Sequence, residues 1–562
     1  MNHHGTSGIL IFLGVLIAAA ALVSCGSSTI PADLVLRDGK IATVDRSFSI
    51  AEAVAVRGDT IVAVGRTADI ERYIGPRTTV IDLGGKIVVP GLIDAHAHLP
   101  GYGISLTRLD FRGTTSFRKI IDMIAEKAKT SGPGEWIQGS SWDQNDWDTG
   151  ELPSHEELSK AVPDNPVWII RVDGHAAIAN RKAMEIAGIT ARTKNPDGGE
   201  ILRKPNGDPT GVFVDNAMDL VSEKIPDISP ERLEEAIVMA TDRCLATGLT
   251  SVHDAGTPVS TIGIYKKLID SDRLGIRIYA LLYPPEHASA ADYLSKNRLI
   301  GYGDDFLTVR SIKLFMDGAL GSRGALMFEP YSDRPGYSGL PMTSYDRALE
   351  ISQDALAAGY QLCTHAIGDK GNRLILDACE QALKEHSTPD HRFRVEHAQV
   401  VALEDIPRFA ALGVLPSMQP THATSDMYWA EARVGPERIK GAYAWRKFLD
   451  SGSIIPCGSD FPVEEINPML GIYAAITRRD PKGWPEGGWY PGECMTREEV
   501  LRGFTCWAAY AAFQEDILGS VEPGKLADLV VLSKDILTIP PEEILTAVPE
   551  YTIVGGKIRY RK

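Results

Sequence analysis

Two histidines that lie close together in the sequence are the first residues that could bind a metal ion. An apolar run ends at Pro90-Gly91, a second apolar pair follows, and His96 and His98 stand two positions apart. On an extended strand, residues two apart point to the same face, so both imidazoles can reach one ion. Divalent-metal sites need three or four ligands, and without further ligands this pair would be ordinary polar loop residues.

Further residues of the metal-binding type follow, each in or at the end of an apolar run. They are Lys313, His365, His397 and Asp460. Strand-like runs that alternate with helical patterns are typical of a (β/α)₈ TIM barrel, whose functional residues gather at the C-terminal ends of the strands. The predicted strands are 87–94, 248–254, 276–282, 309–318, 361–365, 393–397, 413–419 and 453–460, and helices are expected at 344–358 and 370–385.

Five sequence words make the chain resemble the amidohydrolase superfamily and, within it, the amidohydrolase-3 (YtcJ-like) family. The words are PGLIDAHAH, SIKLFMDGALGSR, THAIGD, VEHAQ and GSDFPV, which begin at positions 90, 311, 364, 395 and 458. They occur in the family's order, and the C-terminal stretch 519–532 fits the family as well. The resemblance therefore covers nearly everything after the N-terminal leader.

Nitrogen and oxygen ligands of this kind suit zinc, and manganese, iron or nickel less selectively. His96, His98 and Asp460 can hold one divalent ion, and His365 with His397 a second. Two such ions need a bridging anion, and the resemblance implies that Lys313 supplies it after carbamylation by CO₂. The alternative is a lysine that pairs with Asp317 or with a phosphate.

The expected reaction is hydrolysis of a C–N amide bond in an N-acyl, N-formyl or cyclic amide. A water between two cations loses its proton near neutral pH, and Asp460 would take that proton and return it to the leaving amine. For Glu396, next to His397, a supporting or packing role is expected, and His253 and Asp254 rank below the other residues. Two alternatives stay open: a one-metal deaminase of the same superfamily, and a non-catalytic solute-binding lipoprotein.

The sequence divides into four parts. Residues 1–25 resemble a lipoprotein signal peptide, 32–89 plus 515–562 form an expected β-sandwich, 90–104 plus 231–514 form the barrel, and 105–230 form an inserted substrate or lid subdomain after strand one. In the matching family the insert covers the mouth of the barrel. The weaker candidates for substrate contact are Trp142, Arg171, His175, Asp317 and Arg323, with a core position as the alternative for Trp142.

The N-terminal leader predicts attachment to a membrane. An apolar core over 9–23 precedes Leu22-Val-Ser-Cys25, which resembles a bacterial lipobox with Cys25 as the lipidated residue, although the first residues contain no Lys or Arg. The alternative is an uncleaved membrane anchor. Either way we expect the enzyme body in the cell envelope outside the cytoplasm, in the periplasm if the cell is Gram-negative.

Composition limits the partners of this protein. The net charge of −16 argues against nucleic-acid binding, so the expected partner is a small-molecule amide. The expected contact with the membrane is through the lipid anchor alone. A homodimer is among the expected states. The seven cysteines show no CxxC spacing, and those after Cys25 are expected to be buried free thiols.

Overall fold

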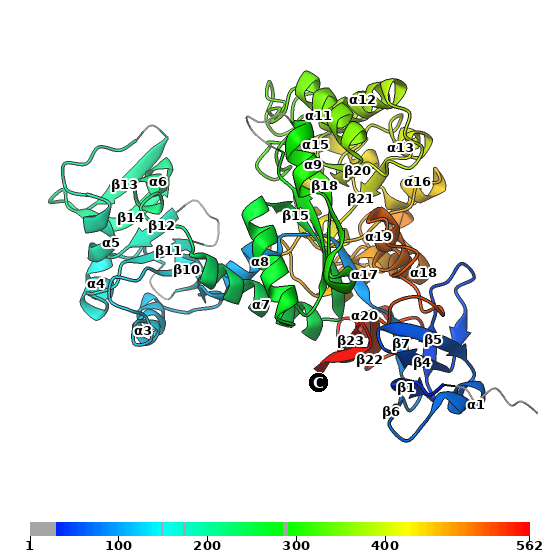
Figure 1. Ribbon diagram of the computed structural model, residues 1–562. Helices are drawn as coiled ribbons and strands as arrows, with labels where there is room; N and C mark the ends of the chain where they lie inside the picture. The colour runs from blue at the N-terminus through cyan, green and yellow to red at the C-terminus, as the bar shows by residue number, and fades with distance from the viewer. Residues whose placement is uncertain (1–29, 148–149, 172–175, 197, 285–289) are drawn as a thin grey trace, which may run out of the picture.

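Three parts of the chain are visible in Figure 1: a central barrel, a β-sandwich from both chain ends, and a lobe inserted after the first barrel strand. The computed structural model describes residues 30–147, 150–171, 176–196, 198–284 and 290–562. The predicted fold class is confirmed. The predicted leader 1–25 with Cys25, and His175, lie outside the described residues. None of the described helices has the length and apolar character that a membrane span requires.

Parallel strands form the wall of the barrel. In the order of the sheet they are β21 (Leu415–Ser417), β20 (Arg394–His397), β19 (Gln361–Ala366), β18 (Leu307–Phe315), β16 (Arg277–Leu282), β15 (Leu249–Thr257) and β8 (Leu92–Ala97). Short β17 (Leu299–Gly301) pairs with β18 in the antiparallel direction. The strands are buried on both faces, which is why they read as nearly continuous apolar runs.

The predicted eighth strand is an extended segment without a regular ladder. It lies between β21 and β8, where Met418 bridges to Cys457. The backbone N–H of Ala95 donates to the carbonyl of Cys457 at 3.0 Å, and that of Asp460 donates to His96 at 2.7 Å. These bonds close the barrel and bring Asp460 beside the end of β8.

Helices surround the barrel, most of them between successive strands and the last ones after the closing segment (Figure 1). They include α7 (Pro230–Ala246), α8 (Val259–Asp270), α9 (Ala290–Asn297), α11 (Tyr345–Ala358), α12 (Asp369–Glu385), α13 (Ile406–Leu412), α15 (Ala430–Arg438), α16 (Trp445–Asp450), α17 (Pro468–Thr477), α18 (Arg497–Gly503) and α19 (Cys506–Ala511). The two helices predicted from apolar spacing are confirmed as α11 and α12. Helix α11 begins after Ser344, whose side chain accepts a hydrogen bond from the backbone of Arg347, and ends at Gly359 with φ of 67°.

One sequence prediction at the start of the barrel is wrong. The predicted strand 87–94 is two strands in two different sheets, because β7 (Ile87–Pro90) pairs with sandwich strands and only β8 belongs to the barrel. Pro90 can donate no ladder hydrogen bond, and Gly91 lies so close to Thr250 that an added Cβ would be 2.1 Å from its Oγ1. The chain therefore changes sheets at Pro90-Gly91.

The β-sandwich combines the N-terminal and C-terminal strands, drawn blue and red in Figure 1. One sheet contains β5 (Thr60–Gly65), β4 (Ala53–Arg57), β1 (Leu34–Arg37) and β6 (Thr79–Asp82), and the other contains β24 (Lys557–Arg561), β23 (Pro549–Val554), β22 (Leu529–Leu532), β7, β2 (Lys40–Ala42) and β3 (Ile50–Ala51). Apolar residues from both chain ends, such as Val56, Val88 and Val531, pack together between the sheets.

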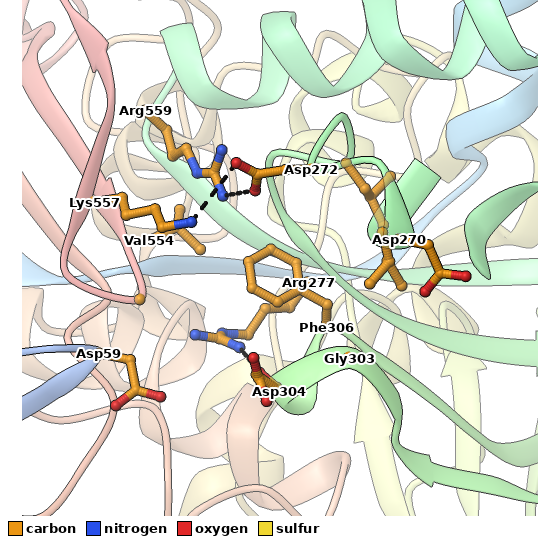
Figure 2. A pocket seen from close by; sticks show the side chains of 13 residues that line it. Asp59, Asp270, Asp272, Arg277, Gly303, Asp304, Phe306, Val554, Lys557 and Arg559 are labelled. Atoms are coloured by element: carbon orange, nitrogen blue, oxygen red, sulfur yellow. Dashed lines mark hydrogen bonds and ion pairs between the residues drawn. The ribbon is translucent and has the colours of Figure 1, made fainter. Parts of the chain in front are cut away.

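Charged residues join the sandwich to the start of the barrel strands. The guanidinium of Arg277, at the first residue of β16, donates to both carboxylate oxygens of Asp528 at 2.8 and 3.0 Å. Lys557 and Arg559 pair with Asp272 across a cavity of about 260 Å³ (Figure 2). This cavity lies at the N-terminal end of the barrel, opposite the predicted metal residues, and its pairs tie the two parts together.

The insert forms a separate lobe beside the barrel, drawn cyan in Figure 1. Its sheet has the order β13 (Gly199–Arg203), β14 (Pro209–Asp215), β12 (Ala176–Ala179), β11 (Val167–Arg171), β10 (Ile137–Trp142) and β9 (Leu109–Asp110). Helices α3 (Phe117–Ala128), α4 (His155–Ala161) and α5 (Arg181–Ile186) accompany it. Two apolar clusters made only of its own residues lie in this lobe. Helix α2 (Leu99–Leu106) leads into it from the barrel.

Candidate metal centre

The C-terminal ends of the barrel strands bring together all six residues predicted to bind metal. His96 is on β8, Lys313 on β18, His365 on β19 and His397 on β20, whereas Asp460 follows the closing segment. Parallel strands of a barrel end at one rim, so side chains from distant parts of the sequence meet there. The sixth residue, His98, directly follows β8.

Short distances define the cluster. His96 Nε2 is 3.1 Å from Lys313 Nζ and 3.8 Å from Asp460 Oδ1, and His98 Nε2 is 3.1 Å from the same oxygen. The ring centroid of His397 is 4.8 Å from that of His96 and 4.6 Å from that of His365. One face of the cluster therefore holds His96, His98 and Asp460, and the other holds His365 and His397, with Lys313 beside them.

The hydrogen bonds on the far side of three imidazoles leave Nε2 free to bind a metal. Nδ1 of His96 lies 2.5 Å from a carboxylate oxygen of Glu396, that of His98 lies 2.8 Å from the carbonyl of Ala255, and that of His397 lies 2.7 Å from Gln419 Oε1. Since these oxygens can only accept, each Nδ1 carries the proton. Such partners fix the ring orientation and tautomer of histidines that bind metals.

Unpaired buried atoms at the cluster fit a divalent metal ion. Among the described residues, His365 Nε2 and Asp460 Oδ1 are buried without a hydrogen-bond partner. Ligand atoms of His96, His98 and Asp460 lie within 4.8 Å of one another. Because buried polar atoms are normally satisfied, and imidazole with carboxylate is a donor set that zinc accepts, the residues present fit the predicted group.

Burial sets the charge states of the cluster. It lowers the pKa of His96 to about 4 and that of His365 to about 3, so both imidazoles are neutral near pH 7, as metal ligands must be. Burial also lowers the pKa of Lys313 to about 8. Burial alone would raise the pKa of Asp460, but the imidazoles around it, His98 first and then His96, His397 and His422, hold that pKa well below its usual range.

Two residues of the cluster have left-handed backbone conformations. The φ of His397 is 73° and that of Asp460 is 64°. Residues other than glycine enter this region at a cost of about 1–3 kcal/mol and stay there only where the surrounding structure holds them. The surrounding barrel therefore holds these two side chains in their orientation against local backbone preference.

A buried ion pair lies directly beneath His96. Glu396 accepts from Arg394 Nη2 at 3.0 Å while its Oε2 contacts His96, and both residues are fully buried. Arg394 Nη1 is 3.0 Å from Nδ1 of His253. Asp254 accepts from the backbone of Leu99 at 2.9 Å and so holds the first residue of α2, directly after His98. The segments that carry the ligands are therefore held by contacts with Glu396, His253 and Asp254.

A cavity of about 400 Å³ opens above the cluster. Its polar lining contains His98, Lys313, His365, His397, Gln399, His422, Asp426, Asp460 and Glu464, and its apolar lining contains Phe315, Leu320, Ile367, Trp429 and Val463. No described residue of 105–230 is part of this lining, so the structure does not bring the insert over the cavity. The cavity is bounded by loops that follow barrel strands.

The weaker candidates for substrate contact that the structure describes are not part of this lining, although Asp317 Oδ1 is 3.8 Å from His365 Nε2. Trp142 is buried in the core of the insert, where its Nε1 donates to Ile169, and this is the alternative position expected for it. Arg171 pairs with Asp143 at 2.8 Å within the insert, and Arg323 pairs with Asp333. Buried Asp317 accepts from the backbone of Leu326, Ile367 and Gly368, so it holds two barrel loops in position.

Sequence reasoning missed His422. It lies on α14 (Pro420–Asp426), which directly follows β21, and its Nε2 is 3.5 Å from Asp460 Oδ2. His397, His422 and Asp460 form a second group of residues whose ligand atoms lie close together. The signal was available, because His422 follows the predicted strand 413–419 in the way that the other site residues follow theirs.

The fold is a (β/α)₈ barrel, and its C-terminal rim carries clustered histidines, an aspartate and a buried lysine. These features are typical of barrel proteins that bind divalent metals. The chain belongs to the amidohydrolase family, whose model matches residues 79–560. The predicted family is thereby confirmed, since the chain is also 31% identical to the putative amidohydrolase YtcJ of Bacillus subtilis over 93% of its own length and 98% of that protein.

Other relatives cover the chain as completely. It is 36% identical to Protein LONG AFTER FAR-RED 3 of Arabidopsis thaliana, with 94% of this chain and 92% of that protein aligned. It is 28% identical to an N-substituted formamide deformylase of Arthrobacter pascens over 94% and 98% of the two chains. An uncharacterized metal-dependent hydrolase from Pyrococcus furiosus matches in structure with a TM-score of 0.75, 29% identity and coverage of 90% and 100%.

Proposed function

We propose that this protein hydrolyses the C–N bond of an amide and binds two divalent ions, in the first instance zinc. His96, His98 and Asp460 would hold one ion, His365 and His397 the other. Lys313, carbamylated by CO₂, would bridge them. Manganese or iron would suit the same nitrogen and oxygen ligands.

The position of Lys313 carries this proposal. Its side chain is 1% exposed and its Nζ lies 3.1 Å from a ring nitrogen that must bind the metal. A protonated amine there would repel a divalent ion, whereas a carbamate supplies a carboxylate in the same place. Burial lowers the pKa of Lys313 to about 8, which makes the neutral amine that reacts with CO₂ accessible near neutral pH. A one-metal deaminase would have no use for this lysine.

Bound metal ions would activate a water near neutral pH and polarise the amide carbonyl. The chain's own residues supply the proton transfers. Asp460 lies at the junction of the two histidine groups, 3.1 Å from His98 Nε2 and 3.5 Å from His422 Nε2. Its low pKa keeps it ionised, so it can accept the proton of the attacking water and deliver it to the leaving nitrogen.

The lining of the cavity favours an amide with an apolar substituent on nitrogen. Phe315, Leu320 and Trp429 offer apolar surface, and Lys313 is the only lysine or arginine among the described lining residues. An N-acyl amino acid would need a cation for its carboxylate. Similarity to a protein named N-substituted formamide deformylase supports the same substrate class. We therefore infer an N-formyl or N-acyl amine as the substrate.

A substrate screen on metal-loaded protein tests the proposal. Zinc- and manganese-loaded protein is incubated with N-formyl and N-acetyl benzylamine and with N-formyl and N-acetyl phenylalanine, and the released amine is quantified. We expect release from the benzylamides and little from the charged phenylalanine derivatives. An Arg323→Ala variant, changed outside the cavity lining, is the control. Failure to release amine from any amide by protein that holds its metal would contradict the function.

The leader supports a further proposal about location. We infer that Cys25 is lipidated and that the enzyme body lies outside the cytoplasm, in the periplasm if the cell is Gram-negative. Full-length protein should fractionate with membranes and accumulate as an unprocessed precursor when lipoprotein signal peptidase is inhibited by globomycin. Membrane association of a Cys25→Ala variant equal to that of the wild type would argue against the lipid anchor.

A further inference from the structure

A fourth histidine at the cavity has the opposite hydrogen-bonding arrangement from the metal-type histidines. His422 is 7% exposed, lines the cavity, and stacks on His397 with ring centroids 5.8 Å apart. Its Nε2 is buried without a hydrogen-bond partner among the described residues, although Asp460 Oδ2 is 3.5 Å away. A buried nitrogen without a partner that lines a cavity can form a hydrogen bond to a molecule bound there.

The partners of Gln399 determine which nitrogen of His422 carries the proton. Asp426 Oδ2 accepts from Tyr443 Oη at 2.6 Å and from Gln399 Nε2 at 3.2 Å. Because the carboxylate accepts, the Gln399 atom that faces it is the amide nitrogen. The same Nε2 is 3.3 Å from Nδ1 of His422. An amide nitrogen only donates, so Nδ1 accepts and the proton of the neutral ring is on Nε2.

This arrangement separates His422 from the histidines that can bind metal. His96, His98 and His397 donate from Nδ1 to oxygen acceptors, which leaves an unprotonated Nε2 toward the cluster. His422 instead presents an N–H to the cavity. A ring nitrogen that carries a proton cannot be a metal ligand, so the proximity of His422 to Asp460 does not make it one.

We propose that His422 is a catalytic hydrogen-bond donor to the carbonyl oxygen of the amide. This inference rests on the proposed function. When water adds to the amide carbon, the π electron pair of C=O moves onto oxygen, and Asp460 receives the proton of the water. When the C–N bond breaks, the electron pair on oxygen re-forms C=O, and the C–N pair goes to nitrogen, which takes that proton from Asp460. His422 keeps its Nε2 proton throughout and stabilises the negative oxygen between these steps.

Gln399, Asp426 and Tyr443 are positioning residues in this proposal. They hold the His422 ring in one tautomer and do not touch the substrate. The hydrogen-bonded chain from Tyr443 to His422 joins the segment before α16, helix α14 and the loop after β20, so the donor is oriented before substrate binds. Preorganised donors of this kind cost no reorganisation during the reaction.

A pair of substitutions at His422 tests the donor role. His422→Gln carries an amide N–H near the position of Nε2, whereas the side-chain N–H of His422→Asn is too short to reach it. We expect kcat to fall about 100- to 1,000-fold in His422→Asn with little change in KM, and much less in His422→Gln. Metal content, measured by mass spectrometry, should equal that of the wild type in both variants. His397→Asn is the matched control and should lose metal.

Two results would overturn the inference. Loss of metal from His422→Asn in proportion to its activity would make His422 a ligand. Equal kcat values for His422→Asn and the wild type would leave it without a role in the reaction. A circular dichroism spectrum and melting temperature like those of the wild type would show that the variants fold.

Nitrogen-15 NMR of histidine-labelled wild-type protein gives a readout that requires no substrate. The His422 resonances, assigned by their absence from His422→Gln, should show a protonated Nε2 and an unprotonated Nδ1. The opposite tautomer would overturn the inference even in an active enzyme. A protein with the expected tautomer and full metal content that hydrolyses no amide would instead contradict the proposed function, and the two failures are thereby distinguished.

Discussion

Replacing Glu396 with Gln is the substitution whose effect the structure specifies most completely. The carboxylate lies between a metal-type histidine and a buried arginine: Oε2 is 2.5 Å from His96 Nδ1, and Oε1 is 2.8 Å from Arg394 Nε. Glutamine has the same shape and can still accept from His96 through its carbonyl oxygen. The substitution therefore removes the negative charge and keeps most of the packing.

We expect Glu396→Gln to lower both the free energy of unfolding and the affinity for metal. Arg394 is 1% exposed and would keep its positive charge without a carboxylate, and removing one partner of a buried ion pair costs about 3–5 kcal/mol of folding free energy. A neutral amide also orients and polarises His96 less strongly than a carboxylate. Loss of such a supporting partner weakens metal binding about 10- to 100-fold, or about 1.4–2.7 kcal/mol.

These effects should be independent of pH near neutrality. Burial alone would raise the pKa of Glu396, but Arg394 and His96 hold it well below its usual range. A carboxyl group whose folded pKa is depressed contributes stability above its unfolded pKa of about 4.3 and loses it as pH falls through the folded value. Measurements between pH 6 and pH 8 therefore compare fully ionised wild type with the variant.

Urea unfolding followed by tryptophan fluorescence measures the change in folding stability. Competition with a chromophoric chelator measures the change in metal affinity. The matched control is Glu404→Gln, because Glu404 pairs with Arg373 at 2.9 Å but is 73% exposed, and its loss should cost less than about 1 kcal/mol. An Arg394→Met/Glu396→Gln double variant should recover folding stability without recovering metal affinity. Wild-type stability and metal affinity in Glu396→Gln would refute the reasoning.

Three further outcomes follow from the cluster. Lys313→Ala should lose bound metal and activity, with partial recovery in acetate or propionate, and normal metal content in that variant would rule out a bridging role. Because burial lowers the pKa of Lys313 to about 8, reactivation of metal-stripped protein at fixed dissolved CO₂ should speed up as pH rises toward about 8 and then level off; continued acceleration toward pH 10 would indicate an ordinary exposed lysine. Asp460→Asn should keep its fold by circular dichroism while kcat falls about 10²- to 10⁴-fold, and a smaller fall would contradict its role in proton transfer.

The sequence alone was sufficient to predict the barrel and to select six of the residues that meet at its rim, although not His422. Strand periodicity puts His96 and His98 on one face, and the ends of parallel strands must converge, so Lys313, His365 and His397 could be brought together without coordinates. These inferences depend on the local strand pattern, which short stretches of chain encode, and on the general geometry of a parallel barrel.

Sequence pattern was less informative where a segment leaves the regular fold. The run 87–94 reads as one strand, yet its two halves pair with β22 and β15 in different sheets. A strand's own residues do not specify its partner strand, because apolar runs look alike whichever sheet buries them. The same limit applies to the insert, whose length predicted a subdomain but whose position beside the barrel depends on packing between distant surfaces.

Tertiary structure alone decided how each histidine is hydrogen-bonded. Whether a ring binds metal or donates to substrate depends on which atom of a distant residue faces Nδ1: Glu396 Oε2 for His96 and Gln399 Nε2 for His422. The members of each pair come from different elements: His96 from β8 and Glu396 from β20, and His422 from α14 and Gln399 from the loop after β20. Residue type can name a histidine as a candidate, but its protonated nitrogen is set by contacts that exist only after the barrel closes.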